Sequence, residues 1–230
     1  MIDMDGVINI YKEAGYTSFD VVAKMRGILK MKKIGHTGTL DPAATGVLPV
    51  CVGKGTKLVE KFMDDDKEYR AVMLLGTVTD SQDMTGNVVS TCEVTVSEDE
   101  VRKAIESFVG GYDQLPPMYS AKKVNGKKLV DLARKGIEVE RQPRFVSIFS
   151  IDINSMELPR VTMTVTCSKG TYIRTLCHDI GTALGCGACM ESLVRTRVGR
   201  FKIEDAVTLN QLEKFRDEDR LEDVVITDLF

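Results

Sequence analysis

The sequence lacks an apolar run long enough to cross a membrane, because no stretch approaches the roughly 18 to 20 residues that a spanning helix needs. The N-terminal segment MIDMDGVINI also lacks a basic region followed by an apolar one, which a secretory signal would contain. We therefore expect a cytoplasmic protein that does not associate with membranes.

Histidine is scarce, and cysteine does not form a metal-binding motif. His36 and His178 leave little material for a histidine-based triad, and no H-E-x-x-H motif is present. Cys177 and His178, followed by Cys186 and Cys189, leave zinc open as a minor alternative, but this C-x-x-C pair has no second pair. Six cysteines without an export signal favour reduced thiols over disulfides. We expect no metal and no disulfide.

The glycine-rich segments do not match nucleotide-binding loops. For a Walker loop, Gly53 and Lys54 would require a glycine at position 48, where the chain has Leu48. The glycines at 181, 185 and 187 do not reproduce G-x-G-x-x-G after a strand. Nucleotide cofactors are therefore not expected.

The net charge of −3 is unevenly distributed. Residues 203–230 hold nine acidic and three basic residues, a net of −6, so residues 1–202 carry +3. Within that part, Lys24–Lys33 holds five basic and no acidic residues, and Lys122–Lys135 holds six basic residues against Asp131. Such clusters can follow a phosphate backbone, although either one is equally typical of a solvated helix face.

Helical and strand patterns alternate along the chain. Ser18 is a candidate cap for a helix with a basic flank, and Ser97 with Glu100 forms a capping box before another helix. Residues 161–167 alternate as a strand that is buried on one face. Further strands are expected at 7–11, 47–52, 69–78, 88–92 and 145–153, and further helices near 56–63, 126–135, 172–184 and 208–217. This mixture predicts an α+β fold.

No linker, repeat or low-complexity segment marks a domain boundary. We expect one catalytic domain over residues 1–202, with two lobes as an option, and a short acidic tail over 203–230.

The segment GHTGTLDPAATGVLPV contains the strongest candidate for a functional residue, Asp41. Pro42 forces Asp41 away from helical geometry, and small neighbours such as Gly38 and Ala44 leave room for a bulky partner beside the carboxylate. An Asp-Pro pair by itself usually forms only a turn. A functional role for Asp41 therefore needs further evidence from other segments of the chain.

That support comes from the order of five segments. After the Asp41 segment follow DDDKEYRAVMLLGTVTDSQDMTG, QLPPMYSAKKVNGKKLVDLARKG, CSKGTYIRTLCHDIGTALGCGA and LVRTRVGRF. Over residues 6–201 the chain resembles the TruB family, which isomerises the T-loop uridine of tRNA, U55, to pseudouridine. The resemblance implies a pseudouridine synthase fold, with a largely antiparallel mixed sheet, flanking helices and a central RNA-binding cleft.

The resemblance implies three catalytic residues. Asp41 matches the family's catalytic aspartate, Tyr69 the aromatic residue that stacks on the flipped base, and Arg174 the arginine that pairs with the aspartate. The reaction detaches uracil N1 from ribose C1′ and rejoins the base through C5, so it needs no redox cofactor and no metal. An aromatic face and a charged neighbour suit a flipped base and a carboxylate in a pocket with little water.

The resemblance also implies four substrate-binding residues. Tyr172 lines the pocket, and His36 matches the histidine that takes the place of the extruded base in the T-loop. Lys57 and Leu193 match positions near the bound uridine. Without the family context, these side chains would be interpreted as core tyrosines, surface cations and a loop histidine.

The chain departs from the family pattern at three points. Lys12-Glu13 stands where the family has Lys-Pro, and Val194-Arg195 stands where it has paired arginines; neither difference is expected to touch the chemistry. Only 29 residues follow Phe201, fewer than a C-terminal RNA-binding module of the PUA kind requires. We therefore expect recognition of tRNA through the T-arm, without an obligatory protein partner.

Two alternatives remain open. One is a guide-RNA-dependent pseudouridine synthase subunit that works inside a particle, and the other is a tRNA-folding chaperone without catalysis.

Overall fold

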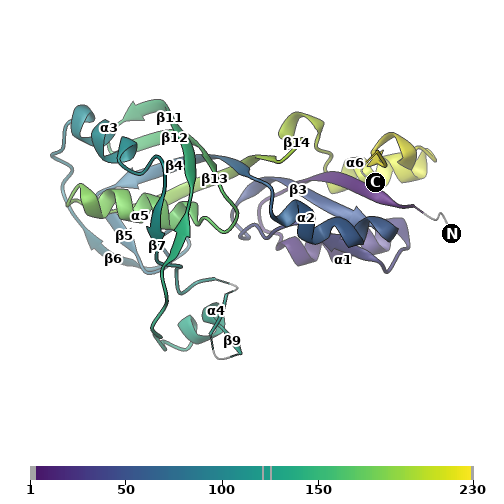
Figure 1. Ribbon diagram of the computed structural model, residues 1–230, viewed down its shortest axis with the longest axis horizontal. Coiled ribbons are helices and arrows are strands. Elements are labelled where there is room, and N and C mark those ends of the chain that lie inside the picture. The colour runs from purple at the N-terminus through teal and green to yellow at the C-terminus, as the bar shows by residue number, and fades with distance from the viewer. Residues whose placement is uncertain (1–3, 121, 125, 229–230) are drawn as a thin grey trace. The chain divides into compact units, whose positions relative to one another are not determined.

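The computed structural model describes residues 4–120, 122–124 and 126–228, and the chain forms two compact units (Figure 1). Unit 1 comprises Met1–Tyr69 and Leu193–Phe230, and unit 2 comprises Arg70–Ser192. Strands β4 (Lys67–Leu75) and β13 (Ala188–Val198) each begin in one unit and end in the other. The division therefore falls inside two strands, where no composition change marks it.

Unit 1 contains a sheet in the order β13-β3-β1-β15, in which β2 also pairs with β3 and β14 with β13. The pairing of β13 with β3 is parallel, and the pairings β1–β15, β1–β3, β2–β3 and β13–β14 are antiparallel. Its other strands are β1 (Gly6–Lys12), β2 (Ile34–His36), β3 (Thr45–Val52), β14 (Phe201–Lys202) and β15 (Val225–Ile226). Its helices are α1 (Ser18–Leu29), α2 (Val59–Met63) and α6 (Leu209–Asp217), with 3-10 turns η1 (Gly53–Leu58), η2 (Ile203–Asp205) and η3 (Leu221–Asp223).

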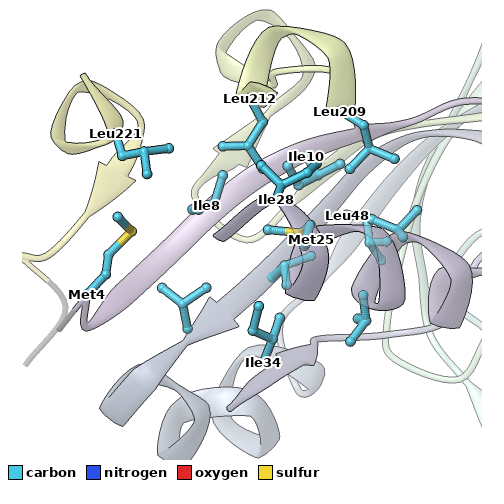
Figure 2. Close-up of a cluster of buried hydrophobic side chains, with 14 residues drawn as sticks. Met4, Ile8, Ile10, Met25, Ile28, Ile34, Leu48, Leu209, Leu212 and Leu221 are labelled. Carbon is cyan, nitrogen blue, oxygen red and sulfur yellow. The ribbon is translucent and has the colours of Figure 1, made fainter. Parts of the chain in front are cut away.

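Apolar side chains cover both faces of this sheet. Since successive residues of a strand point to opposite faces, Ile8 and Ile10 face one side and Val7 faces the other. The first side packs against α1 and α6 (Figure 2), including Met25 and Leu212. The second side packs against Phe62 of α2 and residues of β13 and β14. Two apolar clusters therefore hold β1 and β3 rigid from both sides.

Helix α1 begins one residue earlier than the sequence indicated. The N-cap is Thr17, whose hydroxyl accepts from the Asp20 N–H at 3.0 Å while the Asp20 carboxylate accepts from the Thr17 N–H at 2.8 Å. The prediction that Ser18 is the N-cap is wrong, because Ser18 is the first residue of the helix and is buried. Thr17 and Ser18 are adjacent hydroxyl residues, and Ser18 differs in that its hydroxyl accepts a hydrogen bond from the distant Leu40 N–H.

Within the segment 203–230 that was expected as an acidic tail, the described residues 203–228 form α6, two 3-10 turns and β15. Leu209, Leu212 and Leu221 are buried in the cluster that covers β1, and β15 pairs antiparallel with β1. The acidic residues of this segment are exposed. The net charge therefore describes only the exposed face and gives no sign of the buried leucines.

Unit 2 contains strands in the order β11-β12-β4-β13 and three two-stranded sheets. Its other strands are β5 (Thr77–Thr79), β6 (Val88–Thr91), β7 (Tyr112–Gln114), β8 (Lys123–Val124), β9 (Lys127–Lys128), β10 (Arg144–Val146), β11 (Ile148–Glu157) and β12 (Arg160–Cys167). Its helices are α3 (Glu98–Glu106), α4 (Leu129–Ala133) and α5 (Ile173–Ala183). The helix expected over 126–135 is thus reduced to α4, and position 125 of the basic cluster lies outside the described residues.

Local patterns in unit 2 are confirmed. Val161, Met163, Val165 and Cys167 of β12 are at most 1% exposed. The capping box of Ser97 begins α3, which packs against α5 and β11. The chain therefore has the α+β fold, with a mixed and largely antiparallel set of strand pairs, that its sequence predicts.

Over the described residues, no helix is long and apolar enough to cross a bilayer. The same residues contain no group of three or more His, Cys, Asp or Glu side chains arranged to hold a metal ion. The six cysteines, all within the described residues, are not joined in disulfides, and Cys177 lies fully buried on α5.

Candidate active site

Asp41 lies in the loop between β2 and β3 of unit 1, and hydrogen bonds close this loop at both ends. The Thr37 N–H and hydroxyl both donate to the Pro49 carbonyl, at 3.1 and 3.2 Å. The Ala44 N–H donates to the Asp41 carbonyl at 3.1 Å. Leu40 and Ala44 are each 3% exposed, whereas Pro42 is exposed. Buried neighbours thus hold Asp41 at a partly exposed turn.

Ser18 of α1 anchors the middle of this loop. Its hydroxyl accepts from the Leu40 N–H at 2.9 Å. The loop residue before Asp41 is therefore tied to a helix 22 positions earlier in the chain. This contact explains why Ser18 is buried and why Thr17 caps the helix.

Two buried cations hold the loop backbone from opposite ends of the chain. The Lys12 ammonium donates to the carbonyls of Tyr16 at 2.7 Å and Pro42 at 3.3 Å. The Arg195 guanidinium donates to the carbonyls of Val47 at 2.7 Å and Gly38 at 3.4 Å. Both side chains are 1% exposed. Lys12 and Arg195, each next to a position where the chain departs from the family pattern, therefore hold the backbone of the Asp41 loop; that the departures at Glu13 and Val194 leave the chemistry unaffected stays a prediction.

Close packing explains a glycine at the start of β3. Gly46 has a φ of 106° and lies opposite Arg195 in the parallel β13–β3 pair. A Cβ atom at this position would lie 2.2 Å from the Arg195 carbonyl oxygen. Only glycine allows the backbone that carries Arg195 to approach the end of the Asp41 loop.

Charge and burial shift the pKa of two groups beside this loop. Burial lowers the pKa of Lys12 to about 8, the Asp41 charge opposes the shift, and the Arg195 charge adds to it. Burial, together with the Arg195 charge, lowers the pKa of His36. His36 therefore stays neutral at neutral pH, and its Nδ1 accepts from the Gly38 N–H at 3.4 Å. A neutral imidazole can stack against bases without the desolvation cost of a charge.

The remaining candidates of unit 1 lie on regular elements. Lys57 is exposed on η1, and Leu193 is half-buried on β13. Tyr69 is 9% exposed on β4.

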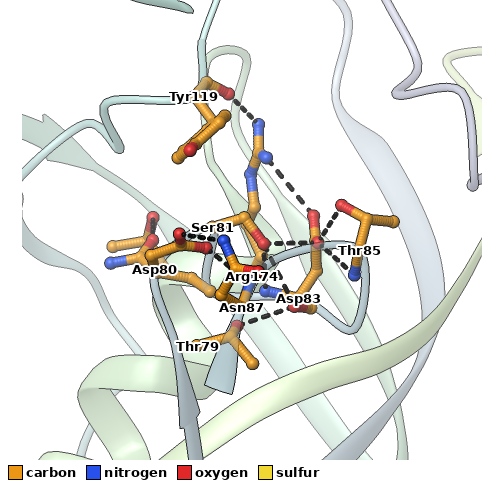
Figure 3. Close-up of polar contacts among 10 residues, drawn as sticks. Thr79, Asp80, Ser81, Asp83, Thr85, Asn87, Tyr119 and Arg174 are labelled. Atoms are coloured by element: carbon orange, nitrogen blue, oxygen red, sulfur yellow. Dashed lines mark hydrogen bonds and ion pairs between the residues drawn. The ribbon is translucent and has the colours of Figure 1, made fainter. Parts of the chain in front are cut away.

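In unit 2, Arg174 lies in the first turn of α5 and is 5% exposed. Its Nη2 donates to the Tyr119 carbonyl at 2.6 Å, and its Nη1 donates to the Asp83 carboxylate at 3.4 Å (Figure 3). Its guanidinium carbon also lies 5.9 Å from the centre of the Tyr172 ring. The arginine is therefore a buried, oriented cation and not a surface ion pair.

Asp83 is itself held by a polar turn (Figure 3). One carboxylate oxygen accepts from the Ser81 hydroxyl at 2.7 Å, the Thr85 N–H at 2.9 Å and the Thr85 hydroxyl at 2.5 Å. The other oxygen faces Arg174. Short polar side chains around an aspartate are typical of such turns, and here they leave one oxygen for the arginine.

The seven candidate residues are divided between the two units. Asp41, Tyr69 and the binding residues His36, Lys57 and Leu193 belong to unit 1, whereas Tyr172 and Arg174 belong to unit 2. Within unit 2, Tyr172 and Arg174 are brought together. The pairing of Arg174 with Asp41 stays a prediction.

The sequence interpretation missed Lys12, Ser18 and Arg195 around Asp41, and Asp83 beside Arg174. For Lys12 the available signal was its place on the same strand face as the buried Ile8 and Ile10, because a charge on a buried face needs partners. The partners of Ser18 and Asp83 lie 22 and 91 positions away, so no local spacing indicates them.

Comparison with known protein families gives two matches, which together cover residues 26–227. The model of the TruB family pseudouridylate synthase N-terminal domain matches residues 26–173. The chain belongs to the TruB family. A second model, the tRNA pseudouridylate synthase B C-terminal domain, matches residues 174–227. It covers α6 and β15, in agreement with their packing against β1.

Curated relatives named tRNA pseudouridine synthase B are about half identical to the chain. The protein of Lachnoclostridium phytofermentans is 55% identical over 97% of this chain and 75% of its own length. The protein of Alkaliphilus oremlandii is 49% identical over 97% of this chain and 74% of its own length.

Among solved structures, the chain resembles one of a Cbf5-Nop10-Gar1 complex, with a TM-score of 0.75 and 36% identity. That match covers 96% of this chain and 58% of the matched chain. A structure of an H/ACA ribonucleoprotein bound to a substrate RNA containing 2′-deoxyuridine gives a TM-score of 0.72 and 33% identity. These likenesses confirm the pseudouridine synthase fold.

Proposed function

We propose that this protein isomerises the T-loop uridine of tRNA, at the U55 position, to pseudouridine. The observation that supports this most directly is the Asp41 loop, in which Ser18, Lys12 and Arg195 hold the backbone around the partly exposed Asp41, within a chain of the TruB family. The relatives named tRNA pseudouridine synthase B supply the substrate class.

The residues suggest a division of roles. Asp41 supplies a carboxylate that assists cleavage and re-formation of the glycosidic bond. A base inside the folded T-loop must be flipped out at a cost of a few kcal/mol, and Tyr69 offers an aromatic face for it. Arg174 supplies a fixed positive charge that favours an ionised carboxylate in a pocket with little water. His36, Lys57, Tyr172 and Leu193 contact the RNA around the flipped uridine.

Replacing Asp41 with Asn tests this proposal. The variant keeps the size of the side chain but loses its charge and nucleophilicity, so we expect no detectable pseudouridine while the Kd for tRNA stays within about threefold. The assay uses purified protein, unmodified tRNA transcript and mass-labelling of pseudouridine. Asp152→Asn, at an exposed position of β11, removes the same charge and should retain the wild-type rate. Turnover by Asp41→Asn would remove Asp41 from its role.

The same assay separates the two alternatives. A guide-RNA-dependent subunit would form product only with guide RNA, and a tRNA-folding chaperone would form none. Identity of 49–55% to proteins named tRNA pseudouridine synthase B, against 33–36% to the matched H/ACA chains, favours the stand-alone enzyme. We therefore propose activity in the cytoplasm without an obligatory protein partner or cofactor.

A further inference from the structure

In unit 2, the side chain of Gln114 pairs with the backbone of Tyr172. Gln114 Oε1 accepts from the Tyr172 N–H at 2.8 Å, and Gln114 Nε2 donates to the Tyr172 carbonyl at 3.0 Å. Gln114 is 1% exposed. This side-chain amide thus satisfies both backbone groups of one residue, much as a neighbouring strand would. Tyr172 is the N-cap of α5 and has no side-chain cap of its own.

The neighbours of Gln114 define the direction of each hydrogen bond. The second Nε2 proton is donated to the Tyr112 hydroxyl at 2.7 Å, so this hydroxyl directs its own proton to Asp179 Oδ2 at 2.8 Å. A reversed amide would place NH₂ against the Tyr172 N–H, which is a second donor. Burial, together with the Asp179 charge, raises the pKa of Tyr112, so the phenol remains a donor throughout the neutral range.

These contacts attach β7 to α5 at two points. Tyr112 and Gln114 are two residues apart on β7 and therefore lie on the same face of that strand. Tyr172 and Asp179 are seven residues apart along α5, so they lie on one face of the helix two turns apart. The attachment thus restrains the rotation of α5 as well as the position of its first turn.

The segment that follows Gln114 makes a second contact with the first turn of α5. Pro116 and Pro117 are buried and restrict the backbone between Gln114 and Tyr119. The Tyr119 carbonyl then accepts from Arg174 Nη2 at 2.6 Å. One short segment therefore contacts both the backbone of Tyr172 and the guanidinium of Arg174.

We propose that Gln114 is a positioning residue for pseudouridine formation, which sets the orientation of Tyr172 and Arg174 through its paired hydrogen bonds to the Tyr172 backbone. This inference rests on the proposed function. Gln114 acts through α5 and touches no reacting atom. Its loss therefore slows the chemical step more than it weakens RNA binding, because small displacements of catalytic groups reduce rates strongly.

The test compares Gln114→Met, Tyr112→Phe and their double variant. Methionine keeps the length and buries well but has neither donor nor acceptor for Tyr172. We expect the single-turnover rate with saturating tRNA to fall about 10- to 100-fold, while the Kd for tRNA changes by less than about threefold. Tyr112→Phe keeps the Gln114–Tyr172 pair and removes only the link to Asp179, so a smaller loss is expected. The double variant should be at least as slow as Gln114→Met, because it removes both attachments of β7 to α5.

A role limited to stability predicts other results. Val101→Ala creates a cavity on α3 without touching these contacts, and it should lower the Tm while keeping the single-turnover rate per folded molecule. Gln114→Met with a lowered Tm and an unchanged rate would overturn the proposal. Should Gln114→Met fail to fold, Gln114→Asn decides, because its amide is one methylene shorter and cannot reach both backbone groups of Tyr172: a wild-type rate in that variant overturns the proposal, and a rate several-fold lower at unchanged Kd supports it.

A readout without catalysis separates this inference from the proposed function. Amide hydrogen exchange should show strong protection of the Tyr172 N–H in the wild-type protein and loss of protection in Gln114→Met. Equal protection in both would refute the pairing. Suppose that the wild-type protein makes no pseudouridine, but that the Tyr172 N–H is protected in the wild type and unprotected in Gln114→Met. The proposed function would then fail, and the pairing of Gln114 with the Tyr172 backbone would stand.

Discussion

At the residue scale, the surroundings of Asp41 depend on side chains whose partners lie far along the chain. Lys12 ends β1, yet its ammonium reaches the carbonyl beside Asp41. Arg195 lies on β13 and reaches the same loop from its other end. Because both cations are buried, their charge acts in a medium that screens it less than water does. The loop therefore combines a partly exposed carboxylate with two buried positive charges.

Lys12 should make stability depend on alkaline pH. Its ordinary pKa of 10.5 applies to the unfolded chain, whereas burial lowers the pKa to about 8 in the folded one. Between these values the unfolded chain binds more protons, so the free energy of unfolding rises with pH. Relative to Lys12→Met, the wild-type protein should gain about 2 kcal/mol across this window, measured by urea unfolding at several pH values.

The Lys12→Met comparison removes the contribution of all other titrating groups, since they are shared by both proteins. A pH dependence that is the same in both would contradict the pKa shift. An NMR titration of the Lys12 side chain in the wild-type protein measures its pKa independently. A midpoint near 10.5 would also contradict the lowered pKa of Lys12.

At the element scale, α6 shows how an acidic segment can be part of the core. Its capping box begins at Thr208, and Leu209 and Leu212 project from one side into the cluster that covers β1. The charged residues occupy the other sides, so the segment has an ordinary amphipathic pattern at helical spacing. The acidic composition of this segment suggested a solvent-exposed tail. The helical spacing of Leu209 and Leu212 instead indicates a helix that packs on the core.

Replacing Leu212 with Ala should destabilise unit 1. Leu212 is 0% exposed, so its truncation leaves a cavity and should cost about 2 to 5 kcal/mol of unfolding free energy. Glu213→Ala, on the exposed face of the same helix, should change it by less than about 0.5 kcal/mol. Chemical unfolding measures both. Equal and small effects would mean that α6 does not pack as described.

At the scale of the whole molecule, charge is divided along the chain. Residues 203–230 carry a net charge of −6, and residues 1–202 carry +3. The five basic side chains of Lys24–Lys33 are all exposed. An exposed basic cluster without acidic residues is suited to contact phosphates. The net charge of −3 therefore does not argue against an RNA substrate.

The salt dependence of tRNA binding should reveal this cluster. If Lys30 and Lys32 each neutralise a phosphate, their joint replacement by Ala should lower the slope of log K against log salt by about 2 and weaken binding. The single-turnover rate at saturating tRNA should remain. The matched control, Lys103→Ala with Lys214→Ala, removes two exposed lysines elsewhere and should leave the slope unchanged. An unchanged slope in the first variant would exclude this cluster from binding.

The sequence by itself determined the local elements, the α+β class and the family. Alternation in β12, the capping box of α3 and the five ordered segments are short-range patterns, which one chain can show without neighbours. It also singled out Asp41 and Arg174, because each lies in a distinctive segment.

Only the tertiary structure decided what holds those residues. Ser18 became an anchor for Leu40 rather than a helix cap, and Lys12 and Arg195 became buried supports of the Asp41 loop. Gln114 reaches Tyr172 across 58 positions. Hydrogen bonds between distant residues follow no period in the sequence, since they depend on how strands and helices pack. The sequence therefore indicated the candidate catalytic residues, and the fold shows which distant side chains contact the segments that carry them.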